Sequence, residues 1–102
     1  MGRRIPIKMP KEQLAQFCET YHIRRISLYG SALRDDFSEN SDIDILIDFE
    51  PGVKAGLLKM ARMENELSDM LGRKVDLRTP GDLSRYFRQE VLDSAEVEYA
   101  KG

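Results

Sequence analysis

Two aspartates, Asp42 and Asp44, stand one residue apart in the otherwise apolar segment DIDILIDF of residues 42–49. Burying a carboxylate without a partner is costly, so a purely structural strand has little reason to hold two of them. Side chains at positions i and i+2 of a strand share one face, about 6.6 Å apart along the backbone. Ions such as Mg²⁺ accept a few carboxylate oxygens and keep other positions for water and substrate phosphates. We therefore expect this strand to bind a metal ion.

Residues before and after this strand complete a site for phosphate chemistry. Gly30 and Ser31 end the segment RRISLYGS, where a glycine allows close backbone approach and the serine hydroxyl and amide can bind a terminal phosphate. Asp76, in KVDLR, is the candidate third carboxylate. A third acid would allow two metal ions, the arrangement that activates an attacking oxygen and stabilises a leaving pyrophosphate. The alternative, in which the aspartates only cap the turn SENS, does not require these other residues.

Alternating helices and strands are predicted to position these side chains. Helical spacing of apolar residues and the breakers Gly and Pro predict three helices, at residues 10–21, 55–72 and 81–100, and three strands, at 24–30, 42–49 and 73–80. The order predicts a single α/β (α+β) domain over residues 1–102, with its core at about residues 10–93. We expect a small mixed sheet flanked by helices.

The apolar spacing also predicts which side chains face the core. On the strand of residues 42–49 these are Ile43, Ile45, Ile47 and Phe49. On the second helix they are Leu57, Leu58, Met60, Ala61, Leu67, Met70 and Leu71, and on the last helix Leu83, Phe87, Val91 and Leu92.

Composition excludes several classes of protein. No apolar run approaches the roughly 20 residues that span a bilayer, so no membrane partner is expected. The single cysteine, Cys18, cannot form an internal disulfide, and with the absence of a secretory signal this predicts a cytoplasmic location. The basic residues near the N-terminus are dispersed without interleaved aromatics, which argues against nucleic acid as a partner.

The order of these motifs resembles the nucleotidyltransferase superfamily that includes DNA polymerase β and the aminoglycoside nucleotidyltransferases. The shared pattern is Gly-Ser, an intervening stretch, Asp-x-Asp, a helix, and a strand that bears a further acid. The segment YGSALRDDFSENSDIDILIDF and the short length of the chain resemble those of the minimal (MNT-type) nucleotidyltransferases. These proteins are the antitoxin halves of HEPN/MNT toxin–antitoxin pairs. The resemblance covers residues 10–93 and is densest at residues 28–50.

The resemblance implies the nucleotidyltransferase fold and a Mg²⁺-dependent transfer of AMP from ATP, with two metal ions and with pyrophosphate released. The resemblance implies that the acceptor is a tyrosine of the partner HEPN ribonuclease toxin. Attachment of AMP to this tyrosine inactivates the toxin. The implied ligands of metal, which are also the catalytic residues, are Asp42, Asp44 and Asp76, and the implied nucleotide-binding residues are Gly30, Ser31 and Arg34. Many members carry Gly after this arginine, whereas Asp35 follows it here.

Two other functions are compatible with the same residues. One is a non-catalytic antitoxin that neutralises the toxin by binding alone, in which the carboxylates are inherited architecture. The other is an adenylyltransferase for a small molecule such as an aminoglycoside. That second alternative has no helical acceptor domain after residue 80, so it would need a dimer to build its pocket.

Overall fold

The fold is organised around strand β2, Ile43–Phe49, in a computed structural model that describes residues 9–33 and 41–101. Its residues alternate between two faces, as the period of two requires. The side chains of Ile43, Ile45 and Ile47 are fully buried in the main core. Asp44 lies on the opposite face of the same strand and is half-buried. The alternation predicted for this strand is therefore confirmed.

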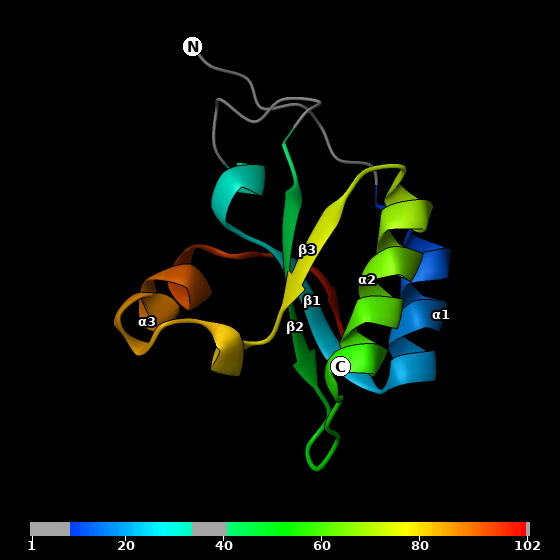
Figure 1. The fold of residues 1–102 in the computed structure, drawn as a ribbon, viewed down its shortest axis with the longest axis horizontal. Helices are drawn as coiled ribbons and strands as arrows, with labels where there is room; N and C mark the ends of the chain where they lie inside the picture. Colours follow the sequence, from blue (N-terminus) through cyan, green and yellow to red (C-terminus); the bar gives the residue numbers. More distant parts are fainter. Residues whose placement is uncertain (1–8, 34–40, 102) are drawn as a thin grey trace.

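Four strands form one mixed sheet in the order β3-β2-β1-β4 (Figure 1). Strand β1, Ile23–Leu28, pairs antiparallel with β2 on one side and with β4, Glu96–Ala100, on the other. Strand β3, Val75–Arg78, pairs parallel with β2. The expected mixed sheet with flanking helices is confirmed, with one strand more than predicted.

Helices α1, Lys11–Tyr21, and α2, Leu57–Leu71, cover one face of this sheet (Figure 1). Gly72, with a φ of 68°, ends α2 in the left-handed conformation that a helix C-terminus favours. Helix α1 buries one apolar stripe, Leu14, Phe17, Cys18 and Tyr21. No helix within residues 9–33 and 41–101 has the length and apolar character to cross a membrane.

Helix α2 also protects the outer edge of strand β3. The Ser68 hydroxyl accepts a hydrogen bond from the Val75 amide at 3.0 Å, and the Glu64 carboxylate accepts one from the Leu77 amide at 2.9 Å. These amides would otherwise be an open template for pairing with another strand. The side chains of α2 thus fix the position of β3 and of the residues it carries.

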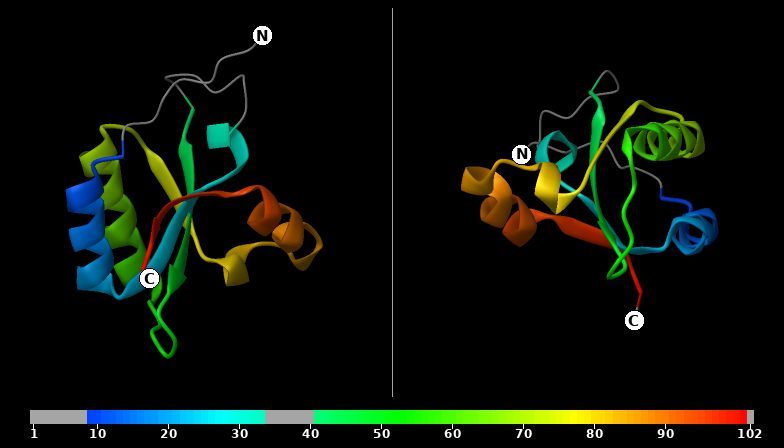
Figure 2. Two further views of the ribbon diagram at one scale, coloured as in Figure 1. Left: turned by 180° about the vertical axis from the view of Figure 1, so that it is seen from behind. Right: turned by 60° about the horizontal axis from the view of Figure 1, so that its bottom comes forward.

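Shorter elements lie on the other side of the sheet (Figure 2). They are the 3-10 turns η1, Gly30–Leu33, and η2, Pro80–Asp82, and helix α3, Arg85–Ser94. Ser84 caps α3 by accepting a hydrogen bond from the Tyr86 amide. No residue of α3 is buried, so this helix is attached to the body mainly through its two ends.

The prediction of one long helix over residues 81–100 is wrong. Helix α3 ends at Ser94, and Ala95 turns the chain into extended backbone before β4. The segment EVEYA can be read with either period, but strand β1 has an open edge that pairs with it. The hydrogen bonds that stabilise β4 come from residues about 70 positions away in the sequence. Helical spacing within the segment cannot predict them.

Several predicted core positions are also wrong. Leu57 and Leu58, in the first turn of α2, are 90% and 87% exposed, and Ala61 is exposed as well. The buried stripe of α2 is Met63 and Leu67, while Met60, Met70 and Leu71 pack at its margin. On α3, Phe87 is 61% and Leu92 37% exposed and Val91 is only half-buried, as is Leu83 before the helix.

Candidate active site

Two of the three predicted carboxylates lie side by side on neighbouring strands. Asp44 of β2 is paired in register with Asp76 of β3. Adjacent strands are about 4.8 Å apart, which brings the two side chains within reach of one cation. Both point away from the helix layer, because their neighbours Val75 and Leu77 fill the core on the other face. Parallel pairing of β2 with β3 therefore creates an acidic position on the face opposite α1 and α2.

Gly30 lies directly against the Asp44 carboxylate. A Cβ atom added at Gly30 would be 2.7 Å from Asp44 Oδ2, closer than any side chain can approach. The backbone here has a φ of 59°, in the region that favours glycine. The Tyr29 amide donates a hydrogen bond to the Asp44 carbonyl at 3.2 Å, which holds the turn over the strand. The glycine of the Gly-Ser motif thus leaves the space that the carboxylate occupies.

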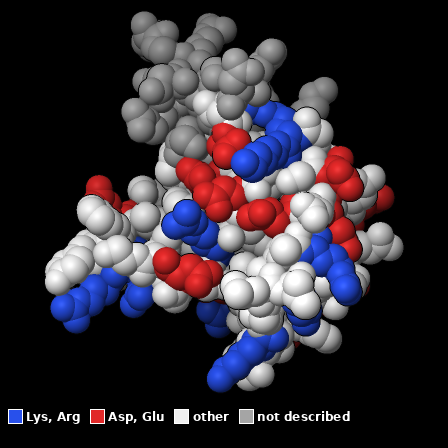
Figure 3. Space-filling view, viewed as in Figure 1, with Lys and Arg blue, Asp and Glu red and all other residues white. Residues whose placement is uncertain are grey.

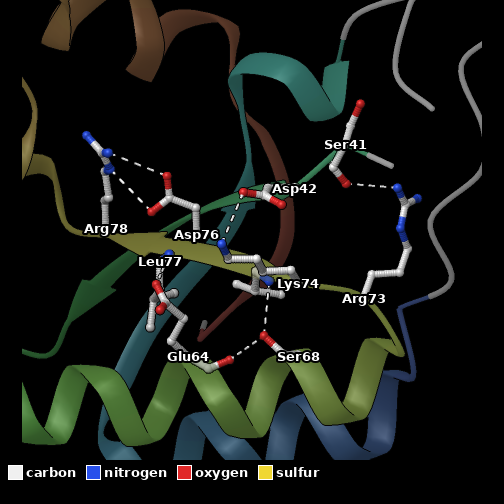
Figure 4. A network of polar contacts seen from close by, with 10 residues as sticks. Ser41, Asp42, Glu64, Ser68, Arg73, Lys74, Asp76, Leu77 and Arg78 are labelled. Atoms are coloured by element: carbon white, nitrogen blue, oxygen red, sulfur yellow. Dashed lines mark hydrogen bonds and ion pairs between the residues drawn. The ribbon is translucent and has the colours of Figure 1, made fainter. Parts of the chain in front are cut away.

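Asp42 lies just before β2 and is tied to the beginning of β3 (Figure 4). Lys74 Nζ is 3.9 Å from Asp42 Oδ2. The Arg73 guanidinium donates to the Ser41 carbonyl at 2.9 Å, and the Ile43 amide donates to the Lys74 carbonyl at the same distance. The segment that carries Asp42 is therefore aligned with β3 before the paired strands begin.

Asp76 is paired with an arginine of its own strand (Figure 4). The Arg78 guanidinium places Nε 3.5 Å from Asp76 Oδ1 and Nη2 3.4 Å from Oδ2. The charge of Asp76 raises the pKa of Arg78, and the hydrogen bonds to the same carboxylate raise it further. Because both side chains are more than one third exposed, the pair stabilises the fold by about 1 kcal/mol or less.

The three carboxylates of Asp42, Asp44 and Asp76 suit a hard divalent cation. In the structure, Lys74 is paired with Asp42 and Arg78 with Asp76. Oxygen ligands from carboxylates are those that Mg²⁺ prefers. Asp44 and Asp76 share a face and a register, and Gly30 leaves room for the Asp44 oxygen. Within the described parts of the chain, no three His, Cys, Asp or Glu side chains lie close enough together to hold a metal. A metal ion bound to Asp42 and Asp76 would compete with their contacts to Lys74 and Arg78.

Tyr29 lies beneath this site, and sequence reasoning did not identify it. Its side chain is 7% exposed. Burial raises the pKa of Tyr29 to about 12, and the nearby charge of Asp44 contributes in the same direction. The phenol therefore stays neutral at physiological pH. The only signal in the sequence was its place immediately before Gly30.

The remaining predicted nucleotide-binding residues are placed only in part. Ser31 lies in η1, directly after Gly30. Arg34 and the adjoining Asp35 lie outside the described residues. In the view of Figure 3, acidic side chains form a band across the middle of the molecule with basic side chains among them. A groove of about 330 Å³ is lined by Ala55, Leu57, Met60, Leu77, Arg78, Thr79 and Asp82, none of which is a predicted site residue.

Comparison with known proteins agrees with these features. The sequence model of the nucleotidyltransferase domain matches residues 11–98. A protein of Methanocaldococcus jannaschii named as a protein adenylyltransferase is 46% identical over 75 residues, which are 74% of this chain and 74% of that protein.

Two solved structures show the same fold. A chain from the crystal structure of a toxin–antitoxin with AMP-PNP superposes with a TM-score of 0.72 at 19% identity, over 91% of this chain and 75% of that one. A chain from the complex of tri-AMPylated Shewanella oneidensis HEPN toxin with MNT antitoxin gives 0.64 at 18% identity, over 89% and 70%. With the match to the family model along most of its length, the chain belongs to the nucleotidyltransferase domain family.

Proposed function

We propose that this chain is a Mg²⁺-dependent adenylyltransferase that transfers AMP from ATP to a tyrosine of a partner HEPN ribonuclease and so acts as its antitoxin. The observation that carries the proposal is the pairing of Asp44 with Asp76 on one face of β2 and β3, with Gly30 against the Asp44 carboxylate. The fold alone gains little from these carboxylates, because the exposed pair of Asp76 with Arg78 contributes about 1 kcal/mol or less. A site for metal-bound phosphates requires them.

Each proposed residue has a distinct task in this reaction. Asp42, Asp44 and Asp76 would hold the metal ions, which neutralise phosphate charge and favour the loss of pyrophosphate when they are bound. Gly30 and Ser31, with Arg34, would bind the β- and γ-phosphates through backbone amides, hydroxyl and guanidinium. Asp76 would accept the proton of the tyrosine hydroxyl as its oxygen bonds to the α-phosphorus and the bond to the β-phosphate breaks.

A folded protein acceptor fits the surface around this site. The two large helices lie on the opposite face of the sheet, so they do not cover the carboxylates (Figure 2). The structure of similar fold that contains an AMPylated HEPN toxin bound to an MNT antitoxin supports the same class of acceptor. We propose a cytoplasmic hetero-oligomer with the toxin as the setting of the reaction.

A second candidate function is neutralisation by binding alone. The ion pairs of Asp42 with Lys74 and of Asp76 with Arg78 favour it, because they stabilise the carboxylates without a metal. Under this hypothesis the site contributes only to folding and to the surface that the toxin contacts.

Growth of cells that produce the toxin from the neighbouring gene distinguishes the two functions. The wild-type chain should restore growth, and the double variant Asp42→Asn, Asp44→Asn should not, although it still forms a complex with the toxin. Asp48→Asn is the matched control, because Asp48 is on the same strand and is paired with Arg25 at 3.9 Å. Full protection by the double variant would replace the catalytic function with neutralisation by binding.

A further inference from the structure

Strand β3 and the residue before it supply two cations to the carboxylates of the candidate metal site. Lys74, directly before β3, lies 3.9 Å from Asp42, and Arg78 of β3 lies 3.4 Å from Asp76. In the sequence the two basic residues stand two positions before and two positions after Asp76. Both carboxylates are thus paired with a basic residue close to Asp76 in the sequence.

A divalent ion and these side chains need the same oxygen atoms. Arg78 uses both Asp76 oxygens, one from Nε and one from Nη2. A metal bound to Asp76 would have to displace at least one of these contacts, since cations repel each other at such distances. The displacement is feasible because the side chains of Arg78 and Asp76 are 49% and 36% exposed and can exchange the contact for water.

We propose that Arg78 is a switching residue that neutralises Asp76 in the metal-free protein and moves to a phosphate group of the nucleotide when metal binds. This inference rests on the metal and nucleotide sites of the proposed function. A guanidinium released within reach of Asp76 lies beside the expected phosphates, and its planar donors suit phosphate oxygens. Arg78 also lines an open groove with Thr79 and Asp82, so its side chain has space to reorient.

Mn²⁺ binding to the purified protein tests the first half of this inference. Removing the internal cation in Arg78→Gln should tighten Mn²⁺ binding without nucleotide by about fivefold, the order expected from one partly exposed ion pair. Arg85→Gln removes the same charge from an exposed residue of α3 that contacts Tyr86, and it should bind Mn²⁺ as the wild type does. Equal Mn²⁺ affinity of Arg78→Gln and wild type would overturn the competition.

Nucleotide binding tests the second half. At saturating Mn²⁺, Arg78→Gln should bind a non-hydrolysable ATP analogue about tenfold more weakly than wild type, the size expected for a lost charge-assisted contact. Unchanged nucleotide affinity would overturn the phosphate role.

The wild-type protein provides an independent measurement that needs no variant to fold. The NMR signal of the Arg78 Nε–H group, assigned by its loss in Arg78→Gln, should shift when Mg²⁺ is added and again when the analogue is added. An Arg78 signal that shifts with neither addition would contradict the switch.

None of these three measurements requires AMP transfer. A protein that gives the expected binding and NMR results but transfers no AMP would therefore refute only the proposed catalytic function. Failure of every variant and the wild type to bind Mn²⁺ would refute the metal site itself.

Discussion

Gly30 and Asp44 form the tightest fit among the individual residues of the site. A Cβ atom at Gly30 would lie 2.7 Å from Asp44 Oδ2, and the φ of 59° adds backbone strain. Gly30→Ala should lower the free energy of unfolding by about 1–2 kcal/mol. It should also lower AMP transfer by about 100-fold, the order that a displacement of about 1 Å can cost, because the carboxylate must move. Urea unfolding and a transfer assay measure the two effects.

Gly72→Ala is the matched control for this substitution. Gly72 has nearly the same φ, 68°, but a Cβ atom there would meet nothing within 4 Å. The control should therefore show a similar loss of stability and full AMP transfer. If Gly30→Ala and Gly72→Ala transfer AMP equally fast, the fit between Gly30 and Asp44 has no role in catalysis.

Cys18 gives a pH-dependent prediction at the same scale. The thiol is 1% exposed, and burial raises its pKa from 9.0 to about 12. Between these values the unfolded chain loses the proton and the folded chain keeps it, so stability is fully present below pH 9 and is lost as pH rises toward 12. The difference in unfolding free energy between wild type and Cys18→Ala should therefore shrink from about pH 8 to about pH 11. A constant difference would show that the folded thiol ionises as freely as the unfolded one.

The aspartates illustrate what residue patterns can predict. Alternation along a strand predicts that Asp42 and Asp44 share one face, and in the structure the pairing of β2 with β3 puts Asp76 beside Asp44. The ion pairs of Lys74 with Asp42 and of Arg78 with Asp76 were not predicted. The first depends on the alignment of two segments far apart in the sequence. The second joins residues two positions apart, but it depends on the side-chain rotamers of the folded protein.

At the scale of elements, the helices and strands with strong local signals were predicted well. Helix α1 and strand β2 have clear apolar periods, and α2 has a glycine at its end. The last segment was misread because α3 buries no residue and β4 exists only through its pairing with β1. Apolar residues such as Phe87 keep helical spacing without a core to pack against.

The weak attachment of α3 has a measurable consequence. Its amides should exchange with solvent much faster than those of β2, which lies between two other strands and carries fully buried isoleucines. Hydrogen exchange followed by mass spectrometry of the isolated protein measures both. Equal protection of α3 and β2 would mean that the helix packs on the body more firmly than its exposure indicates.

At the scale of the whole molecule, the sheet of order β3-β2-β1-β4 has the large helices on one face and the candidate active site on the other. Most of the core also lies on the face of the helices, and the carboxylates of β2 and β3 lie on the opposite face (Figures 1 and 2). Substitutions at the acidic positions should therefore leave folding largely intact. The carboxylate face carries only the short elements η1 and η2 and the exposed helix α3 (Figure 2).

The central claim is that these carboxylates transfer AMP to a protein partner, and the intact mass of that partner tests it most directly. After incubation of the neighbouring gene's protein with this chain, ATP and Mg²⁺, mass spectrometry should show a gain of one or more AMP units. Asp48→Asn should give the same gain, and the double variant Asp42→Asn, Asp44→Asn should give none. A partner that gains AMP equally with the double variant, or that gains none with the wild-type chain, would contradict the account.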